Sequence, residues 1–261
     1  MRVFIKNDYN ELSAFVADYI AEKINEFKPT AENPFILGLP TGSSPIGTYN
    51  HLAELHKKGK VSFEHVITFN MDEYVGLAHD DPESYRHFMH KHLFDRIDIK
   101  KENINILDGM ASDLKKECDA FEAKIKKYGR IHLFLAGIGS NGHLAFNEPG
   151  SSMSSRTRVK KLTYTTREDN SRFFGDDISK VPGQALTVGV GTVYDSEEVM
   201  LIASGRNKAD AIHRTIEGGI SHMCTASMLQ MHQRGVIVCD RNAASKLSPH
   251  VAEYFQQIVH W

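Results

Sequence analysis

The sequence contains few cysteines and no long hydrophobic run. Its 261 residues include only three cysteines, Cys118, Cys224 and Cys239, and no CxxC spacing. This number and spacing argue against a disulfide framework and favour reduced thiols. No apolar segment approaches the roughly 20 residues needed to span a membrane, and no signal pattern opens the chain. We therefore expect a cytoplasmic protein that is neither exported nor inserted into a membrane.

An excess of charge of either sign is also missing. The 31 lysines and arginines nearly balance the 33 aspartates and glutamates, which leaves a formal net charge of −2. Such a chain has no overall field that attracts nucleic acid or a membrane surface, so we expect neither as a partner. His87 and His90 share a predicted helix face near His92, but no third ligand and no HExxH motif accompany them, so we expect no metal site.

Apolar runs alternate with amphipathic segments along the whole chain. Strands are expected at 1–5, 35–39, 66–69, 104–107, 131–136, 162–165, 185–190, 199–203 and 236–239. Helices are expected at 11–27, 45–58, 82–94, 113–128, 207–216, 221–231 and 242–257. This alternation predicts an α/β fold with a doubly wound, mainly parallel sheet and helices on both faces. We expect a single domain over residues 1–261 with a small lid subregion.

The most informative stretch is the segment 131–150, IHLFLAGIGSNGHLAFNEPG. An apolar run typical of a buried parallel strand ends in three glycines, which allow tight turns and close approach to a ligand. His143 and Glu148 follow on the same loop. Because open α/β sheets bind ligands at the carboxyl ends of their strands, we interpret His143 as a catalytic group oriented by Glu148 or Asn141. A structural histidine is the alternative interpretation.

The glycines at 137, 139 and 142 also spell G-x-G-x-x-G, the fingerprint of dinucleotide-binding folds. That fingerprint needs a helix at the third glycine and an acidic residue about 20 residues later. Here the sequence NEPG at 147–150 interrupts any helix, and the zone expected to hold the acid, 156–161, is basic. We therefore expect no nicotinamide cofactor.

Other expected strand ends carry candidate binding groups. The turn GSS at 42–44 lies between a strand and a helix N-terminus, where free amides and the helix dipole favour an anion, although the lysine of a Walker loop is missing. Asp72 follows a buried strand and is a candidate general base, with a solvated loop acid as the alternative. Arg172 and Lys208 are either phosphate contacts or ordinary surface charges.

Several of these residues lie within longer blocks of distinctive sequence. The blocks are LGLPTG at 37–42, FNMDEYVGL at 69–77, GH at 142–143 followed by FNEP at 146–149, SRTR at 155–158 and ALTVGVGT at 185–192. With these blocks in this order over nearly its full length, the chain resembles the glucosamine-6-phosphate deaminase (isomerising) family, which includes glucosamine/galactosamine-6-phosphate isomerases. The resemblance implies a modified Rossmann-like doubly wound fold, a three-layer αβα sandwich, and assembly into a homohexamer.

The resemblance also implies an activity: conversion of glucosamine 6-phosphate and water to fructose 6-phosphate and ammonia, without a metal or organic cofactor. Asp72 matches the base that moves a proton between C2 and C1. His143, with Glu148 as its partner, matches the group that helps to open the pyranose ring. The family's phosphate cradle matches Gly42, Ser43, Ser44, Arg172 and Lys208. Some members are activated by N-acetylglucosamine 6-phosphate, and the matching residues are Ser151, Ser152, Arg158, Lys160 and Tyr254.

Two positions depart from the family pattern. Asn141 stands where many relatives carry Asp beside the catalytic Gly-His pair, and an amide adds no negative charge. Glu148 is then the only formal charge that the sequence places near His143. Cys224 stands where Trp is expected after His222 and Met223, a difference that concerns the packing of a hinge or lid.

Two alternative functions remain. A hydrolase similar to 6-phosphogluconolactonase would share the fold and release no ammonia. A phosphosugar-sensing binding protein or regulator usually carries an additional DNA-binding segment. Here the strand pattern begins at Arg2, and no basic helix-turn-helix stretch is left over.

Overall fold

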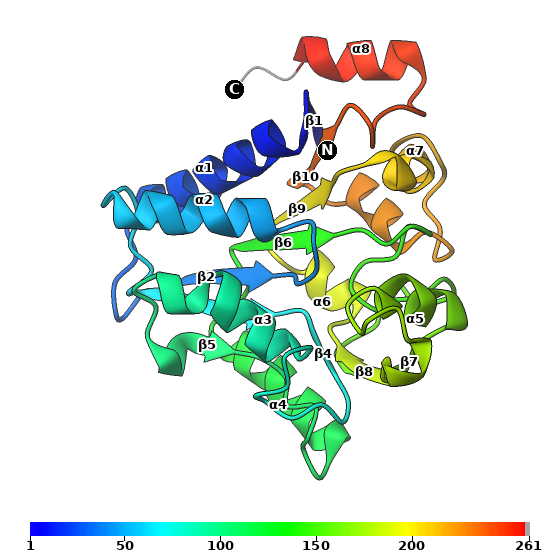
Figure 1. The fold of residues 1–261 in the computed structure, drawn as a ribbon. Helices are drawn as coiled ribbons and strands as arrows, with labels where there is room; N and C mark the ends of the chain where they lie inside the picture. The colour runs from blue at the N-terminus through cyan, green and yellow to red at the C-terminus, as the bar shows by residue number, and fades with distance from the viewer. Residues whose placement is uncertain (259–261) are drawn as a thin grey trace.

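A seven-stranded sheet forms the centre of the computed structural model, which describes residues 1–258 (Figure 1). Its strands are β1 (Arg2–Lys6), β2 (Phe35–Leu39), β3 (Val66–Asn70), β5 (Ile104–Asn105), β6 (Leu133–Gly137), β9 (Glu198–Ala203) and β10 (Gly235–Asp240). They lie in the order β1-β10-β9-β6-β2-β3-β5, and every neighbouring pair is parallel. Each coincides with an expected strand to within a few residues, because doubly covered strands are written as continuous apolar runs.

Helices cover both faces of this sheet and give it two separate cores. One core lies beneath α1 (Tyr9–Phe27), α2 (Ile46–Lys57) and α3 (Tyr85–His92), and the other beneath α4 (Leu114–Lys127), α6 (Val190–Tyr194) and α7 (Ala209–Ile216). Successive residues of each strand alternate between them: Met200 packs into the first core and Leu201 into the second. The predicted three-layer αβα fold is therefore confirmed.

A second, smaller sheet lies beside the first, at the lower right of Figure 1. It consists of the antiparallel strands β4 (Asp72–Tyr74), β8 (Gln184–Thr187) and β7 (Arg158–Lys161), followed along the chain from β7 by α5 (Tyr164–Ser171). Tyr74, Phe146 and Phe174 belong to a third core formed in this region. The strand expected at 162–165 is wrong, because the half-exposed sequence RVKK at 158–161 forms β7 and the hydroxyl of Thr163 caps α5.

Three expected helices differ in extent. The segment 221–231 contains only a 3₁₀ helix, Thr225–Gln230. The last helix, α8 (Pro249–Ile258), starts later than expected, because Asp240 and Glu217 hold the preceding turn by accepting hydrogen bonds from Ala243 N–H and Ser248 N–H. α3 begins at Tyr85 rather than Pro82, since its cap is Ser84, whose hydroxyl accepts from the third helical amide.

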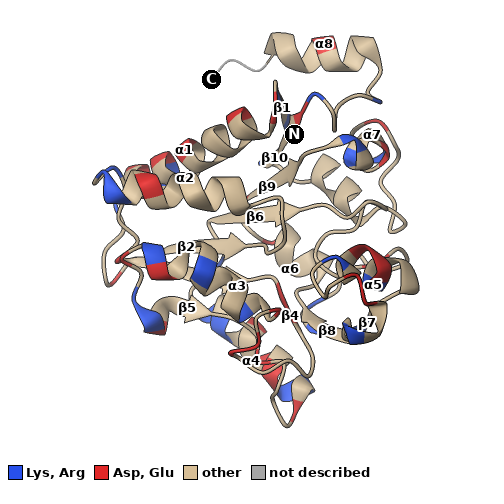
Figure 2. Cartoon of the chain, in the orientation of Figure 1, with Lys and Arg blue, Asp and Glu red and all other residues tan. Residues whose placement is uncertain are grey.

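The described residues contain no helix long and apolar enough to cross a membrane. Within the same residues no group of three or more histidine, cysteine, aspartate or glutamate side chains could hold a metal ion. Cys118, Cys224 and Cys239 are all buried free thiols. Figure 2 shows acidic and basic residues interspersed over the helices, in keeping with the small net charge.

Candidate active site

A cavity of about 390 Å³ opens at the carboxyl ends of four neighbouring strands, β3, β2, β6 and β9. From β2 the chain continues to β3 on one side, and from β6 it continues towards β9 on the other. The cavity therefore lies at the topological switch point, where open α/β sheets bind ligands. Its wall includes the turn 40–44, Met71, Asp72, Tyr85, residues 137–140, His143, Thr166, Asp169, Asn170, Arg172, Phe173, Ser204, Asn207 and Lys208.

Glycine is required at two positions of the loop after β6. A Cβ at Gly139 would lie 2.4 Å from the Cε1 and Nε2 atoms of His143. Gly142 has a φ of +88°, and a Cβ there would lie 2.5 Å from Sγ of Cys224. The backbone closes the loop through hydrogen bonds from Gly139 N–H to His143 C=O and from Gly142 N–H to Gly139 C=O. The loop thus fixes the imidazole in the cavity wall, and the buried thiol of Cys224 fills the space behind Gly142.

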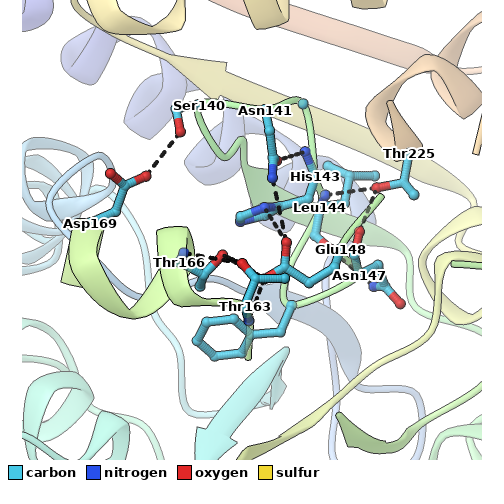
Figure 3. A network of polar contacts seen from close by, with 12 residues as sticks. Ser140, Asn141, His143, Leu144, Asn147, Glu148, Thr163, Thr166, Asp169 and Thr225 are labelled. Atoms are coloured by element: carbon cyan, nitrogen blue, oxygen red, sulfur yellow. Dashed lines mark hydrogen bonds and ion pairs between the residues drawn. The ribbon is translucent and has the colours of Figure 1, made fainter. Parts of the chain in front are cut away.

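His143 and Glu148 form a buried pair. Nδ1 of His143 lies 3.7 Å from Oε2 of Glu148, and the two side chains are 15% and 5% exposed. The other carboxylate oxygen of Glu148 accepts hydrogen bonds from the hydroxyls of Thr163 and Thr166, which fix its orientation (Figure 3). Burial lowers the pKa of His143, and the charge of Glu148 opposes this by raising it. An imidazole held largely neutral in this way can accept a proton near neutral pH.

Asn141 contacts both members of this pair, through the backbone of His143 and the carboxylate of Glu148. Its Oδ1 accepts the backbone N–H of His143 at 3.2 Å, and its Nδ2 lies 3.4 Å from Oε2 of Glu148 (Figure 3). The amide therefore contacts the carboxylate and the backbone of the pair. Within residues 1–258 the Nδ1 atom of His143 has no hydrogen-bond partner, and the nearby charge of Glu148 is its ion-pair contact. The catalytic roles assigned to these three residues remain predictions.

Replacing Asn141 with aspartate tests the electrostatics of this loop. A carboxylate here adds a negative charge beside Glu148, which favours the imidazolium form and raises the pKa of His143. We expect the histidine-linked limb of the kcat/KM profile to move to higher pH in an enzyme that remains active. The measurement is kcat/KM against pH for both proteins, with Asp72→Asn as a blank. A limb that stays in place or moves to lower pH would show that residue 141 does not influence the imidazole.

Asp72 lines the cavity with a carboxyl group that is almost entirely buried. It is the first residue of β4, opposite Thr187 of β8, and only 5% of its surface is exposed. Its Oδ1 atom is buried and has no hydrogen-bond partner within residues 1–258. Burial, and after it the negative charge of Glu73, raise the pKa of Asp72 well above its usual range. A buried carboxylate without a partner is costly, and this geometry favours a ligand contact over the solvated loop acid considered above.

The neighbouring acid, Glu73, has a supporting role that sequence inspection missed. Its carboxylate accepts hydrogen bonds from the backbone N–H groups of Tyr74, Tyr85 and Arg86. The last two amides belong to the first turn of α3, so Glu73 holds this helix end and with it Tyr85 in the cavity wall. The acidic pair was visible in the sequence. Which of the two acids lines the cavity depends on the alternation of side chains along β4, a strand that was not expected.

The turn 42–44 offers free hydrogen-bond donors. Within residues 1–258 no group accepts from the amides of Gly42, Ser43 and Ser44, whereas the phenol of Tyr9 donates to the carbonyls of both serines from behind. Gly42 has a φ of +92°, which favours glycine. α2 begins at Ile46 after Pro45, one residue later than expected, and Ser44 makes no side-chain hydrogen bond at this helix start. The serine hydroxyl is therefore not engaged by the helix.

Two cations line the same cavity as this turn. Lys208 follows β9 and Arg172 follows α5, and neither forms an ion pair within residues 1–258. Burial lowers the pKa of Lys208, and the charge of Arg172 lowers it further. Two cations without paired acids, lining one cavity with free amides, form an environment suited to a dianion. The structure brings together every residue expected in the phosphate cradle, and the binding role itself remains a prediction.

Asp240, at the end of β10, supports the segment that carries Lys208, as Glu73 supports the start of α3. It accepts hydrogen bonds from the Ser204 hydroxyl at 2.6 Å and from the Gly205 N–H. Asp240 was not selected from the sequence. The available signal was its position at the end of an expected strand that neighbours β9, but the strand order was not known.

The expected activator residues lie outside this cavity. Ser151 is buried and Ser152 exposed on the loop before β7, and Arg158 and Lys160 lie on β7. Tyr254 is 57% exposed on α8, at the opposite end of the molecule in Figure 1. One chain therefore does not gather all five residues into one pocket, and the activator site remains a prediction.

Comparison with known proteins gives a consistent result. The sequence model of the family described as glucosamine-6-phosphate isomerases/6-phosphogluconolactonase matches residues 7–238. A glucosamine-6-phosphate deaminase of Borreliella burgdorferi is 58% identical over 258 residues, 99% of this chain and 96% of the relative. A solved structure of a monomeric glucosamine-6-phosphate deaminase superposes with a TM-score of 0.90 at 41% identity, covering 94% of this chain and 99% of the other. The 6-phosphogluconolactonase of Trypanosoma cruzi shares the fold, with a TM-score of 0.74 at 21% identity over 95% of this chain and 97% of the other.

Proposed function

The chain belongs to the family of glucosamine-6-phosphate isomerases and 6-phosphogluconolactonases, and from this we propose that it is an enzyme that converts glucosamine 6-phosphate and water to fructose 6-phosphate and ammonia. The observation that carries the proposal is the cavity itself. It combines an unpaired buried carboxylate, a histidine with a carboxylate partner, and free amides together with two cations. A base, an acid–base group and an anion cradle are what this reaction needs.

The geometry supports a division of labour within the cavity. The amides of 42–44, Lys208 and Arg172 hold the phosphate, whose fixed position orients the sugar for reaction. His143, paired with Glu148, exchanges a proton with the ring and hydroxyl oxygens at C5 and C1, so that the pyranose opens. Asp72 then removes the proton from C2 and delivers it to C1. Water replaces the nitrogen at C2, and ammonia leaves.

The degree of sequence identity to known relatives favours the deaminase proposal over the lactonase alternative. The similar deaminases are more than half identical to this chain over nearly its full length, whereas the lactonase of T. cruzi, at 21% identity, supports the fold alone.

A hexamer and an N-acetylglucosamine 6-phosphate activator stay predictions, and the similar solved deaminase is described as monomeric. We also propose that β7, β8 and α5 form the lid of a single-domain enzyme.

An assay with a chelator tests the function. Purified protein given glucosamine 6-phosphate and excess chelator should produce fructose 6-phosphate and ammonia in equal amounts, because no step requires a metal. Hydrolysis of 6-phosphogluconolactone should not exceed the spontaneous rate. Lactone hydrolysis without ammonia release would support the alternative, and activity lost on chelation and restored by a divalent ion would contradict the metal-free proposal.

A further inference from the structure

Asp169 connects two parts of the cavity wall that come from different elements. It lies on α5, and its Oδ2 accepts a hydrogen bond from the hydroxyl of Ser140 at 2.9 Å (Figure 3). Ser140 belongs to the glycine loop that ends at His143, and both Ser140 and Asp169 line the cavity. The bond therefore ties the helix that precedes Arg172 to the loop that holds the imidazole.

The carboxylate of Asp169 also faces the charged groups of the site. Its negative charge raises the pKa of His143, as Glu148 does, and raises that of Lys208, against the lowering caused by burial and Arg172. After burial, the charges that act on the pKa of His143 are, in decreasing order, those of Glu148, Lys208 and Asp169. The expectation that Glu148 is the only formal charge near His143 is wrong, because α5 folds back over the glycine loop.

We propose that Asp169 is a positioning residue of the active site, which fastens α5 to the glycine loop through Ser140 and supplies beside His143 a second carboxylate that Asn141 does not provide. This inference rests on the proposed deaminase activity. Two consequences follow. Asp169 favours the charged form of the imidazole, and it repels the substrate phosphate held by the nearby Lys208 and Arg172. Both effects are moderate, because the carboxylate is exposed to water.

Two substitutions distinguish the effect of the hydrogen bond between Ser140 and Asp169 from the effect of the negative charge of Asp169. Asp169→Asn removes the charge and keeps an oxygen that can accept the Ser140 hydroxyl, whereas Ser140→Ala removes the hydrogen bond and keeps the charge. Glu168→Gln is the matched control, since Glu168 is an exposed acid on the same helix that does not line the cavity. Each protein is examined for the affinity of inorganic phosphate by calorimetry and for the NMR titration of the His143 imidazole, assigned with a His143→Gln variant.

Asp169→Asn should bind phosphate about two- to five-fold more tightly and titrate His143 at lower pH. Ser140→Ala should bind phosphate more weakly, because Arg172 follows a helix that is no longer fastened, and Glu168→Gln should match the unmodified protein. Weaker phosphate binding in Asp169→Asn with an unmoved imidazole titration would indicate a purely structural contact and overturn the proposal, as would no change in either variant.

The kinetic consequence follows in the same variants. The histidine-linked limb of kcat/KM should move to lower pH in Asp169→Asn and stay in place in Glu168→Gln. Because phosphate affinity and imidazole titration need no turnover, an enzyme that fails to deaminate glucosamine 6-phosphate would refute the proposed function without deciding the role of Asp169. In an active enzyme, altered phosphate binding in Asp169→Asn without a shift of the histidine-linked limb of kcat/KM would refute the role of Asp169 and leave the proposed function standing.

Discussion

Replacing Asp72 with asparagine should lower kcat for glucosamine 6-phosphate by about 10²–10⁴-fold, the usual contribution of a general base. Asparagine has nearly the same shape and cannot accept the C2 proton. The phosphate is held at another part of the cavity, by 42–44, Lys208 and Arg172, so binding of the phosphosugar should change little. Rapid-quench turnover and equilibrium binding of glucosamine 6-phosphate measure the two quantities separately.

Stability provides the control for this variant. Burial raises the pKa of Asp72 in the folded protein, so ionising this carboxyl opposes folding increasingly as the pH rises above the ordinary carboxyl range. Asparagine removes that cost, and the melting temperature of Asp72→Asn at neutral pH should equal or exceed that of the unmodified protein. Near-normal turnover would mean that another residue is the base. A lower melting temperature would leave the lost activity attributable to altered folding, and the prediction would then have failed.

Replacing Lys208 or Arg172 with alanine should weaken the binding of phosphorylated ligands by about 10- to 100-fold. Each charge-assisted hydrogen bond to phosphate contributes on the order of 1.5–3 kcal/mol. The larger effect is expected for Lys208, because it is partly buried while Arg172 is exposed and more strongly screened by solvent. The effect should appear mainly in KM and in the inhibition constant of inorganic phosphate.

Arg206→Ala is the matched control for this experiment. Arg206 lies in the same 3₁₀ turn as Lys208, is exposed, and does not line the cavity. Removing it changes the net charge equally but should leave KM within about two-fold, as exposed charges usually do. Unchanged affinity in both Lys208→Ala and Arg172→Ala would mean that the phosphate binds elsewhere. An equal loss of affinity in Arg206→Ala would mean that the effect comes from the net charge of the protein and not from these two side chains.

Much of the fold and the centre of the site could be predicted from the sequence because the signals are local. Buried parallel strands are continuous apolar runs, and the groups that follow them, such as Asp72 and His143, must gather at one edge of the sheet. Gly139 and Gly142 could likewise be identified as a tight turn, although only the structure shows the imidazole and the Cys224 thiol that exclude a side chain at each position.

The features that the sequence did not predict depend on contacts between distant segments. β7 is an edge strand of mixed, half-exposed residues, so it lacks an apolar run, and the small sheet forms only when β4 and β8 join it. Asp169 and Asp240 accept hydrogen bonds from loops that lie many residues earlier in the chain and that follow other strands. Neither the periodicity nor the spacing of residues shows which distant loops these two carboxylates contact. The order of the strands in the sheet and the position of α5 against the glycine loop determine it.

The most direct test of the central claim is a crystal structure of Asp72→Asn with glucosamine 6-phosphate bound, since the slow variant should retain its ligand. We predict the phosphate against the amides of 42–44 and the side chains of Lys208 and Arg172, C2 next to the asparagine that replaces Asp72, and the His143 ring at the sugar's ring oxygen. A sugar phosphate bound in another part of the protein, or bound here in reverse with its phosphate beside His143, would contradict the account.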